Sequence, residues 1–299
     1  MSSSHGLSAQ ALFDVSGYVA LVTGGGTGIG LMIAEGLASN GAIVYIAARR
    51  MDVVSKAAEA FDQTSGGGKL VPLELDVIDK TSISKAVARI QQEHGRLDAL
   101  VNNAGQVGPV SEFISDRQSP ENASADSLGK AVFDSESFEQ WSNHFTVNVS
   151  SIFFVTMAFL GLLEAGANAR PNHGSAVINI GSISGLMTLN QGHFCYNSGK
   201  AAVHHLTKML ATEFGLKGHK IRVNAIAPGL FLSELVDPGD KHIDEVVDKL
   251  SGSLIPVPAK RAGRPSDMAA CALYLASAAG SYVNGQILVP DGGWVAVNP

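Results

Sequence analysis

The sequence predicts an α/β protein in which a doubly wound parallel sheet carries helices on both faces. Short, nearly continuous apolar runs alternate with longer amphipathic runs, which is typical of parallel strands buried on both faces. A glycine-rich stretch, Thr23–Gly30, directly follows the first apolar run. Neither an internal repeat nor a linker divides the chain, so residues 1–299 are predicted to form a single domain.

Four strands and three helices are predicted in the first part of the chain. The first helix follows the glycine-rich stretch and ends before Asn40-Gly41, a helix-stop signal. Asp52 is expected to cap the second helix, and the third covers Ser82–Glu93. The strands are Tyr18–Val22, Ile43–Ala47, Leu70–Leu75 and Ala99–Val101.

The remaining elements continue the alternation of strands and helices. Helices are predicted near Phe138–Glu164, around Tyr196 and near Pro265–Ala276, and strands at Ala176–Ile180, Arg222–Ile226 and Gln286–Val289. Two segments lie outside this pattern. Residues 1–14 are expected to be a short frayed tail, and residues 106–134 an inserted loop rich in Ser, Pro, Asn, Gly and acids. A loop of this length is either functional or disordered, and the sequence leaves both open.

Composition restricts the class of partner. The formal net charge is −6 and no stripe of Lys or Arg occurs, which argues against nucleic acid. No apolar run is as long as a membrane span, and the opening residues lack the pattern of a signal peptide. We therefore expect a soluble, cytoplasmic protein. Its two cysteines, Cys195 and Cys271, form no framework, and Cys195 has no Cys or His at metal-ligand spacing, so we expect a packed thiol and no metal.

The glycine-rich stretch is a candidate phosphate site. A turn between a strand and a helix presents backbone N–H groups and the positive end of the helix to one point, which suits a pyrophosphate. Glycine is needed there because side chains would block the approach. The stretch carries Gly24, Gly28 and Gly30 and does not match G-x-G-x-x-G. The alternative is a turn that only packs the helix on the strand.

The end of the second predicted strand indicates which dinucleotide would bind. An NAD site usually places an acid here to take the ribose hydroxyls, but this chain has Ala48. Arg49 and Arg50 follow, and two cations suit a 2′-phosphate. We therefore expect NADP(H) rather than NAD(H), with Arg49 the better candidate. Alternatively, the two arginines only solvate the end of the strand.

Tyr196 and Lys200 are a candidate acid–base pair. On a helix, residues four apart share a face, so the phenol and the ammonium would lie side by side. A free tyrosine has a pKa of about 10, and a nearby cation lowers it by favouring the phenolate. This spacing is common in proteins, so the pair indicates a function only together with the other motifs of the chain.

Taken in order, these motifs resemble the short-chain dehydrogenase/reductase family. The resemblance begins at Thr23–Gly30 and continues through Asp76-Val77, the stretch Asn102–Gly105, and Asn148. Downstream it includes Ser182, the Tyr196/Lys200 pair, Pro228-Gly229, Arg261–Pro265 and Gly285–Gly293, so it covers almost the whole chain.

The resemblance implies a role for each of four residues. Tyr196 would donate a proton in reduction or accept one in oxidation, and Lys200 would lower the tyrosine pKa and hold the nicotinamide ribose. Ser182 would hydrogen-bond the substrate oxygen, and Asn148 would anchor a water that relays protons to Lys200. Two alternatives stay open. Ser182 could cap the end of the strand, with Ser184 as the reactive serine, and Asn148 could be an ordinary buried amide.

The resemblance also implies the cofactor contacts and the assembly. A homotetramer or dimer is expected, with the helices of Asn148 and Tyr196 at the interface. Asp76 could instead cap a helix rather than bind the cofactor. The implied cofactor-binding residues are Gly24, Thr27, Gly28, Ile29, Gly30, Arg49, Arg50, Asp76, Val77, Asn103, Ala104, Gly105, Tyr196, Lys200, Pro228, Gly229, Phe231 and Ser233.

Two features depart from the family pattern. The stretch between Asn103 and Asn148 is longer than usual, and Ser233 replaces the usual threonine while keeping a hydroxyl. Residues 231–262 occupy the position of the family's substrate loop and mix apolar side chains with charges, which favours an apolar or mixed small-molecule carbonyl or alcohol. His193 is a cap, a surface group or a cleft residue, and His204 and His205 are expected on a helix face or subunit contact.

Three functions are compatible with these residues. The first is an NADPH-dependent carbonyl reductase that acts on a ketone or a 3-oxoacyl thioester. The second keeps the fold and the cofactor but carries out dehydration, isomerisation or epimerisation without net redox. The third is a cofactor-sensing binding protein with idle catalytic residues, which the intact Ser182, Tyr196 and Lys200 disfavour.

Overall fold

The protein is built on a parallel sheet of seven strands in the order β3-β2-β1-β4-β5-β6-β7. We describe a computed structural model for residues 4–61, 67–231 and 256–298. The predicted doubly wound fold is confirmed, because the strand order reverses between β1 and β4. The strands are β1 Val19–Thr23, β2 Ile43–Ala48, β3 Lys69–Glu74, β4 Ala99–Asn102, β5 Ser175–Ile180, β6 Ile221–Ile226 and β7 Ile287–Leu288.

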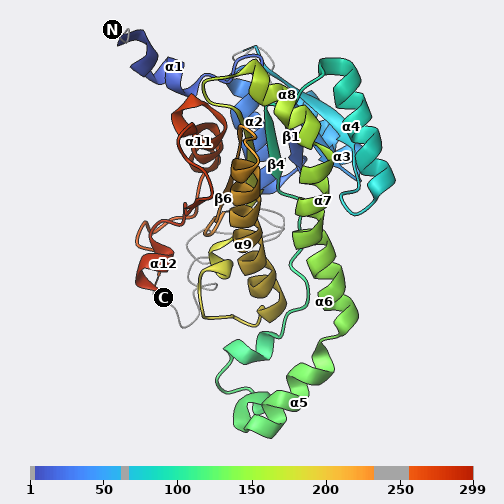
Figure 1. Cartoon of the computed structure of the whole chain (residues 1–299). Helices are drawn as coiled ribbons and strands as arrows, with labels where there is room; N and C mark the ends of the chain where they lie inside the picture. The colour runs from blue at the N-terminus through green and yellow to red at the C-terminus, as the bar shows by residue number, and fades with distance from the viewer. Residues whose placement is uncertain (1–3, 62–66, 232–255, 299) are drawn as a thin grey trace.

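Helices cover the sheet on both faces (Figure 1). One face packs against α2 (Gly28–Ser39), α3 (Met51–Ala60) and α11 (Pro265–Ala276). The other packs against α4 (Lys80–His94), α7 (Ser151–Ala158), α8 (Leu160–Ala169) and α9 (Phe194–Leu216). Along β1, Ala20 and Val22 enter the first core while Val19 and Leu21 enter the second, so the two-residue period of a strand needs apolar residues throughout.

The predicted helix Phe138–Glu164 is wrong as one element. The chain forms α6 (Phe138–Phe145), a π-helical turn at Thr146–Ser150, α7, and then α8 after a bend of 57°. The apolar pattern of the sequence could not reveal the break, because a π turn adds one residue to a helical turn and leaves the surrounding residues apolar. No single helix of the described residues is long and apolar enough to span a membrane, although the bent pair Phe138–Ala158 and Leu160–Ala169 meets the criteria together.

Two segments predicted to lack regular structure contain helices. Residues 106–134 include the short turns Glu112–Ser115 and Pro120–Ala123 and most of α5 (Ala125–Ser135). Ser124 begins α5 with a reciprocal capping box, which explains why a serine-rich stretch is helical. α5 has no buried residue, and Figure 1 shows α5 and α6 extending away from the sheet. The N-terminal tail likewise forms the turn Ser4–Leu7 and α1 (Ala9–Phe13).

The expected cap at Asp52 is also wrong. α3 begins at Met51, so Asp52 lies in its first turn, where a carboxylate still complements the helix dipole. α4 is capped by Asp79, whose carboxylate accepts from the N–H groups of Thr81 and Ser82. α4 therefore starts two residues before the predicted Ser82.

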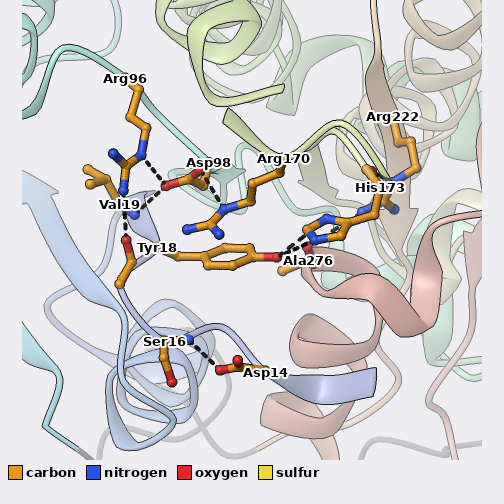
Figure 2. Close-up of polar contacts among 11 residues, drawn as sticks. Asp14, Ser16, Tyr18, Val19, Arg96, Asp98, Arg170, His173, Arg222 and Ala276 are labelled. Carbon is orange, nitrogen blue, oxygen red and sulfur yellow. Dashed lines mark hydrogen bonds and ion pairs between the residues drawn. The ribbon is translucent and has the colours of Figure 1, made fainter. Parts of the chain in front are cut away.

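A buried carboxylate joins the amino ends of β1 and β4 (Figure 2). Asp98 is fully buried, and its two oxygens accept from Nε of Arg170 at 2.8 Å, Nε of Arg96 at 3.2 Å and the Val19 N–H at 2.8 Å. The Arg170 guanidinium also lies 3.7 Å from the ring centroid of Tyr18. Three donors therefore compensate one desolvated charge, which a buried carboxylate needs.

A buried cation at this end of the sheet is stabilised by carbonyl oxygens instead of by an opposite charge. Arg222 is 6% exposed and donates to the carbonyl oxygens of His173, Gly280 and Ala276. Ala276 is the last residue of α11, so the guanidinium meets the negative end of that helix. Burial lowers the pKa of Arg222 to about 10, which leaves it charged at neutral pH.

We expect Asp98→Ala to destabilise the fold strongly. The change strands the Arg170 guanidinium and the Val19 N–H in a buried site, and breaking such a pair costs about 3 kcal/mol or more. Denaturant unfolding followed by circular dichroism measures the loss. The matched control is Asp134→Ala, which breaks the exposed ion pair with Lys130 on α5 and should leave the unfolding free energy unchanged. Equal effects for the two variants would contradict the assigned role of Asp98.

Candidate active site

The glycine-rich stretch lies at the carboxyl ends of β1 and β4, where the strand order reverses. It leaves β1 at Thr23 and enters α2 at Gly28, with Thr27 at the N-cap position. Gly24 and Gly28 have positive φ angles of 64° and 52°, a conformation that favours glycine. A methyl group at position 30 would lie 2.2 Å from the Gly24 carbonyl oxygen. Side chains are thus excluded from a turn that leads into a helix N-terminus, which fits the predicted phosphate cradle.

Asn103 fixes this turn to the end of β4. Its Nδ2 donates to the carbonyl oxygens of Thr23 and Gly24, each at 3.0 Å. The Thr23 hydroxyl accepts from the backbone N–H groups of Asn103 and Ala104 at 3.0 and 3.1 Å. The predicted cofactor residues Asn103 and Ala104 therefore hold the glycine turn in place. Gly105 follows them and approaches the amide of Asn148.

The remaining predicted contacts of the adenosine half lie at the ends of β2 and β3. Arg49 and Arg50 are both exposed and directly follow β2. Asp76 follows β3 and is half-buried, and its carboxylate accepts from the Ile78 N–H at 3.1 Å. Asp76 is therefore not the cap of α4, and its neighbour Val77 packs against the core beneath.

Asn148 is buried in the π-helical turn, and both ends of its side-chain amide are hydrogen-bonded. Its Oδ1 accepts from the Gln106 N–H and its Nδ2 donates to the Gln106 carbonyl oxygen, each at 2.9 Å. This two-way contact joins the chain that leaves β4 to the helix that runs toward α7. π turns occur often at functional sites, because they change which backbone groups face outward.

Ser182 and Tyr196 are brought together. The Ser182 hydroxyl hydrogen-bonds the Tyr196 phenol and also accepts from the Ser184 N–H at 3.1 Å. Ser182 thus both caps the turn after β5 and meets the tyrosine, whereas Ser184 is the residue that it caps. Burial raises the pKa of Tyr196, and the hydrogen bond from Ser182 opposes that rise.

Lys200 lies beneath the tyrosine, as the spacing predicts. It is 6% exposed, and its Nζ lies 5.6 Å from the Tyr196 ring centroid and donates to the Ile180 carbonyl oxygen at 2.8 Å. Burial lowers the pKa of Lys200 to about 8. The expected lowering of the tyrosine pKa by Lys200 is not the net result in this structure, because burial of the phenol dominates.

Three further side chains lie near this pair, and from the sequence only His193 was considered for the cleft; it stands at the N-cap position of α9. The His144 ring lies 5.9 Å from that of Tyr196, and the His193 ring lies 6.3 Å from it. His204, expected on a helix face or subunit contact, is only 5% exposed, because it falls one turn after Lys200 on the buried face of α9. His205 is exposed as expected. Cys195 is the packed thiol that the sequence predicts, with its pKa raised to about 11 by burial.

The segment after β6 lines the side of the site. The Pro228 carbonyl oxygen accepts from the Ile183 N–H at 3.0 Å, and Gly229 donates to the Pro290 carbonyl oxygen at 3.1 Å. The Phe231 ring is 2% exposed and packs over Gly263, so this predicted cofactor residue offers only its backbone. Ser233 lies outside the described residues, as does most of 231–262.

Comparison with known proteins identifies the family. The family model described as enoyl-(acyl carrier protein) reductase matches residues 24–295. The short-chain dehydrogenase/reductase PhomF of Diaporthe leptostromiformis is 39% identical over 297 residues, which cover 98% of this chain and 96% of that protein. The chain belongs to the short-chain dehydrogenase/reductase family.

Two further comparisons lead to Pseudomonas aeruginosa. The rhamnolipids biosynthesis 3-oxoacyl-[acyl-carrier-protein] reductase is 35% identical over 282 residues, or 94% of this chain and 98% of that protein. The solved RhlG/NADP active-site complex superposes with a TM-score of 0.77 at 33% identity, over 95% of this chain and 98% of that chain. Relatives named as reductases and dehydrogenases support an oxidoreductase that acts on a small molecule.

The burial of Lys200 predicts a specific dependence of stability on pH. Its pKa is about 8 in the folded protein against 10.5 for an ordinary lysine, so the unfolded state binds more protons between these values. Stability relative to Lys200→Met should therefore rise by about 3 kcal/mol from pH 8 to pH 10.5, because one pKa unit corresponds to about 1.4 kcal/mol. Denaturant titrations across this range measure it. The control is Lys208→Met, at an exposed lysine of α9. The difference in unfolding free energy between wild type and this variant should not change across the same pH range.

Proposed function

We propose that the protein is an NADP(H)-dependent oxidoreductase that reduces a ketone to a secondary alcohol, or catalyses the reverse reaction. The observation that carries the proposal is the convergence of Ser182, Tyr196 and Lys200 at the same edge of the sheet as the glycine turn. NADPH would supply the hydride to the carbonyl carbon, and the protein must supply a proton to the carbonyl oxygen. The relative solved with NADP supports the choice of cofactor.

The proton chemistry follows from the environment of the phenol. A tyrosine whose pKa is raised stays protonated at neutral pH, so Tyr196 can donate to an oxygen that becomes an alkoxide. The Ser182 hydroxyl has one proton, so with substrate bound it would turn from the phenol, donate to the same oxygen and stabilise its developing charge. Lys200, with a pKa of about 8, would return a proton to the phenol after the transfer.

The walls beside Tyr196 favour an apolar substrate. Segments 106–111 and 186–194 meet where the Ser111 N–H donates to the Gly192 carbonyl oxygen at 2.9 Å. Four large apolar side chains on these segments remain 38–45% exposed: Val110, Leu186, Leu189 and Phe194. Such side chains beside a reactive tyrosine suit an acyl chain or an apolar ring rather than a polyanion.

Tyr196→Phe should abolish turnover and leave NADPH affinity within a few-fold, because the phenol oxygen is the proton donor. The expected fall in kcat is about a thousandfold. Absorbance of NADPH with a panel of ketones, a 3-oxoacyl thioester and an enoyl thioester measures it. Tyr282→Phe, at a fully exposed tyrosine, is the matched control and should keep wild-type activity.

A collapse of NADPH binding in Tyr196→Phe would make the residue structural. Product formation without consumption of cofactor would favour dehydration, isomerisation or epimerisation instead.

Arg49→Ala should weaken NADPH roughly tenfold or more and NADH little, because only NADPH carries the 2′-phosphate. Titration of cofactor fluorescence gives both dissociation constants. Arg50→Ala is the neighbouring comparison, and the larger effect is expected at Arg49. Equal losses for NADPH and NADH would contradict the NADP(H) assignment.

We also propose a homodimer or homotetramer joined through α7 and α9. Phe153, Phe154 and Met209 are 40%, 43% and 55% exposed on these helices, and a subunit contact would remove them from water. Sedimentation velocity should show a dimer or tetramer, and Phe153→Glu should dissociate it. A monomer at micromolar concentration would contradict this assembly.

A further inference from the structure

His144 is a fully buried titratable side chain that the proposed mechanism leaves unused. It comes from α6 and is 0% exposed. Its ring occupies a slot between two glycines, because a methyl group at Gly108 would lie 2.7 Å from its Nδ1 and one at Gly199 would lie 2.7 Å from its Nε2. Gly199 stands in the helix between Tyr196 and Lys200, where glycine costs roughly 1 kcal/mol relative to alanine.

Neither ring nitrogen of His144 has a hydrogen-bond partner among the described residues. A neutral imidazole carries one donor and one acceptor, and a buried group without a partner costs about 1–3 kcal/mol. Two features at this place therefore lower the stability of the fold: a glycine inside a helix and a buried polar ring without a hydrogen-bond partner. A leucine or phenylalanine would fill the same space without the second cost, so packing alone does not account for a histidine.

The neighbours of His144 are the catalytic groups. Its ring meets the Tyr196 ring at 5.9 Å and an interplanar angle of 62°. Burial, and then the charge of Lys200, lower the pKa of His144 to about 4, so the ring is neutral at physiological pH. The other titratable groups around the tyrosine in the described chain are Lys200 and His193, with Glu112 acting on His193.

We propose that His144 is a positioning residue for Tyr196: held in its slot, its ring fixes the plane of the phenol and keeps a polar group against it. The inference rests on the proposed function, because it assigns His144 an effect on the proton donor of that reaction. The effect is dipolar rather than acid–base, since His144 neither titrates near neutral pH nor contacts solvent. An apolar ring of similar size would hold the phenol but leave the phenolate less stabilised.

The main test compares His144→Phe with His144→Gln in alcohol oxidation, where Tyr196 must be deprotonated. His144→Phe should lower kcat about tenfold and move the rising limb of the pH–rate profile up by about one unit, because a unit of pKa is tenfold in equilibrium. His144→Gln keeps a polar group and should fall between His144→Phe and wild type. KM for the cofactor should change less than twofold in both, and Tyr282→Phe, at a fully exposed tyrosine, should behave as wild type.

A second variant tests the slot without removing the histidine. Gly199→Ala places a methyl group against the His144 ring and should shift the same pH limb, although alanine favours the helix. Gly215→Ala, in the same helix with open space at its Cβ position, is the matched control and should leave activity and profile unchanged. If His144→Phe does not fold, the inference is decided by this pair. Identical kinetics for Gly199→Ala and Gly215→Ala would overturn it.

A direct measurement separates this inference from the proposed function. The pKa of Tyr196, obtained by NMR of tyrosine-labelled protein against Tyr196→Phe, should be about one unit higher in His144→Phe than in wild type. This readout needs no turnover, so it stands even if no carbonyl substrate is found and the proposed function fails. An unchanged Tyr196 pKa in folded His144→Phe, whether or not kcat falls, would overturn the inference.

Discussion

The position of α9 depends on a buried ladder of amides and hydroxyls. Asn102, at the end of β4, donates to Asn179 of β5 at 2.9 Å and to Thr156 of α7 at 3.1 Å. Asn179 donates in turn to Thr207 of α9 at 3.0 Å. All four side chains are buried, and a hydrogen-bond ladder in such surroundings has one low-energy register. It therefore sets where α9 stands against the sheet, and with it Tyr196 and Lys200.

Desolvation governs the chemistry of the site. Burial raises the pKa of Tyr196 and lowers that of Lys200, so both groups are displaced toward their neutral forms. The Lys200 ammonium, with a pKa of about 8, is therefore a stronger acid than the phenol, whose pKa lies above its ordinary value of 10. This order favours return of a proton from Lys200 to a tyrosinate. The hydrogen bonds that fix the pair, from Ser182 to the phenol and from Lys200 to Ile180, come from the end of β5 and the turn after it.

The insertion is connected to the site rather than separate from it. Ser111 is 1% exposed, donates through its backbone to Gly192 and through its hydroxyl to Glu136 at 2.8 Å. Gly192 lies four residues before Tyr196, so the inserted chain supports the loop that leads into α9. α6 continues from the insertion and supplies His144. The insertion thus contributes a wall to the site and α6, which follows it, contributes the buried ring of His144, while α5 extends away from the sheet (Figure 1).

The sequence by itself determined the strands, the parallel sheet, the family and the Tyr196/Lys200 face, because these depend on local periodicity and spacing. β5 and α11 fall within one residue of their predicted bounds for that reason. The sequence could not show the π turn at Asn148, the helix within the insertion or the burial of His204. These follow from contacts between residues that are distant in the chain. Tertiary structure alone decided that His144 lies beside Tyr196, because the slot is formed by glycines 36 positions before and 55 positions after it, at Gly108 and Gly199.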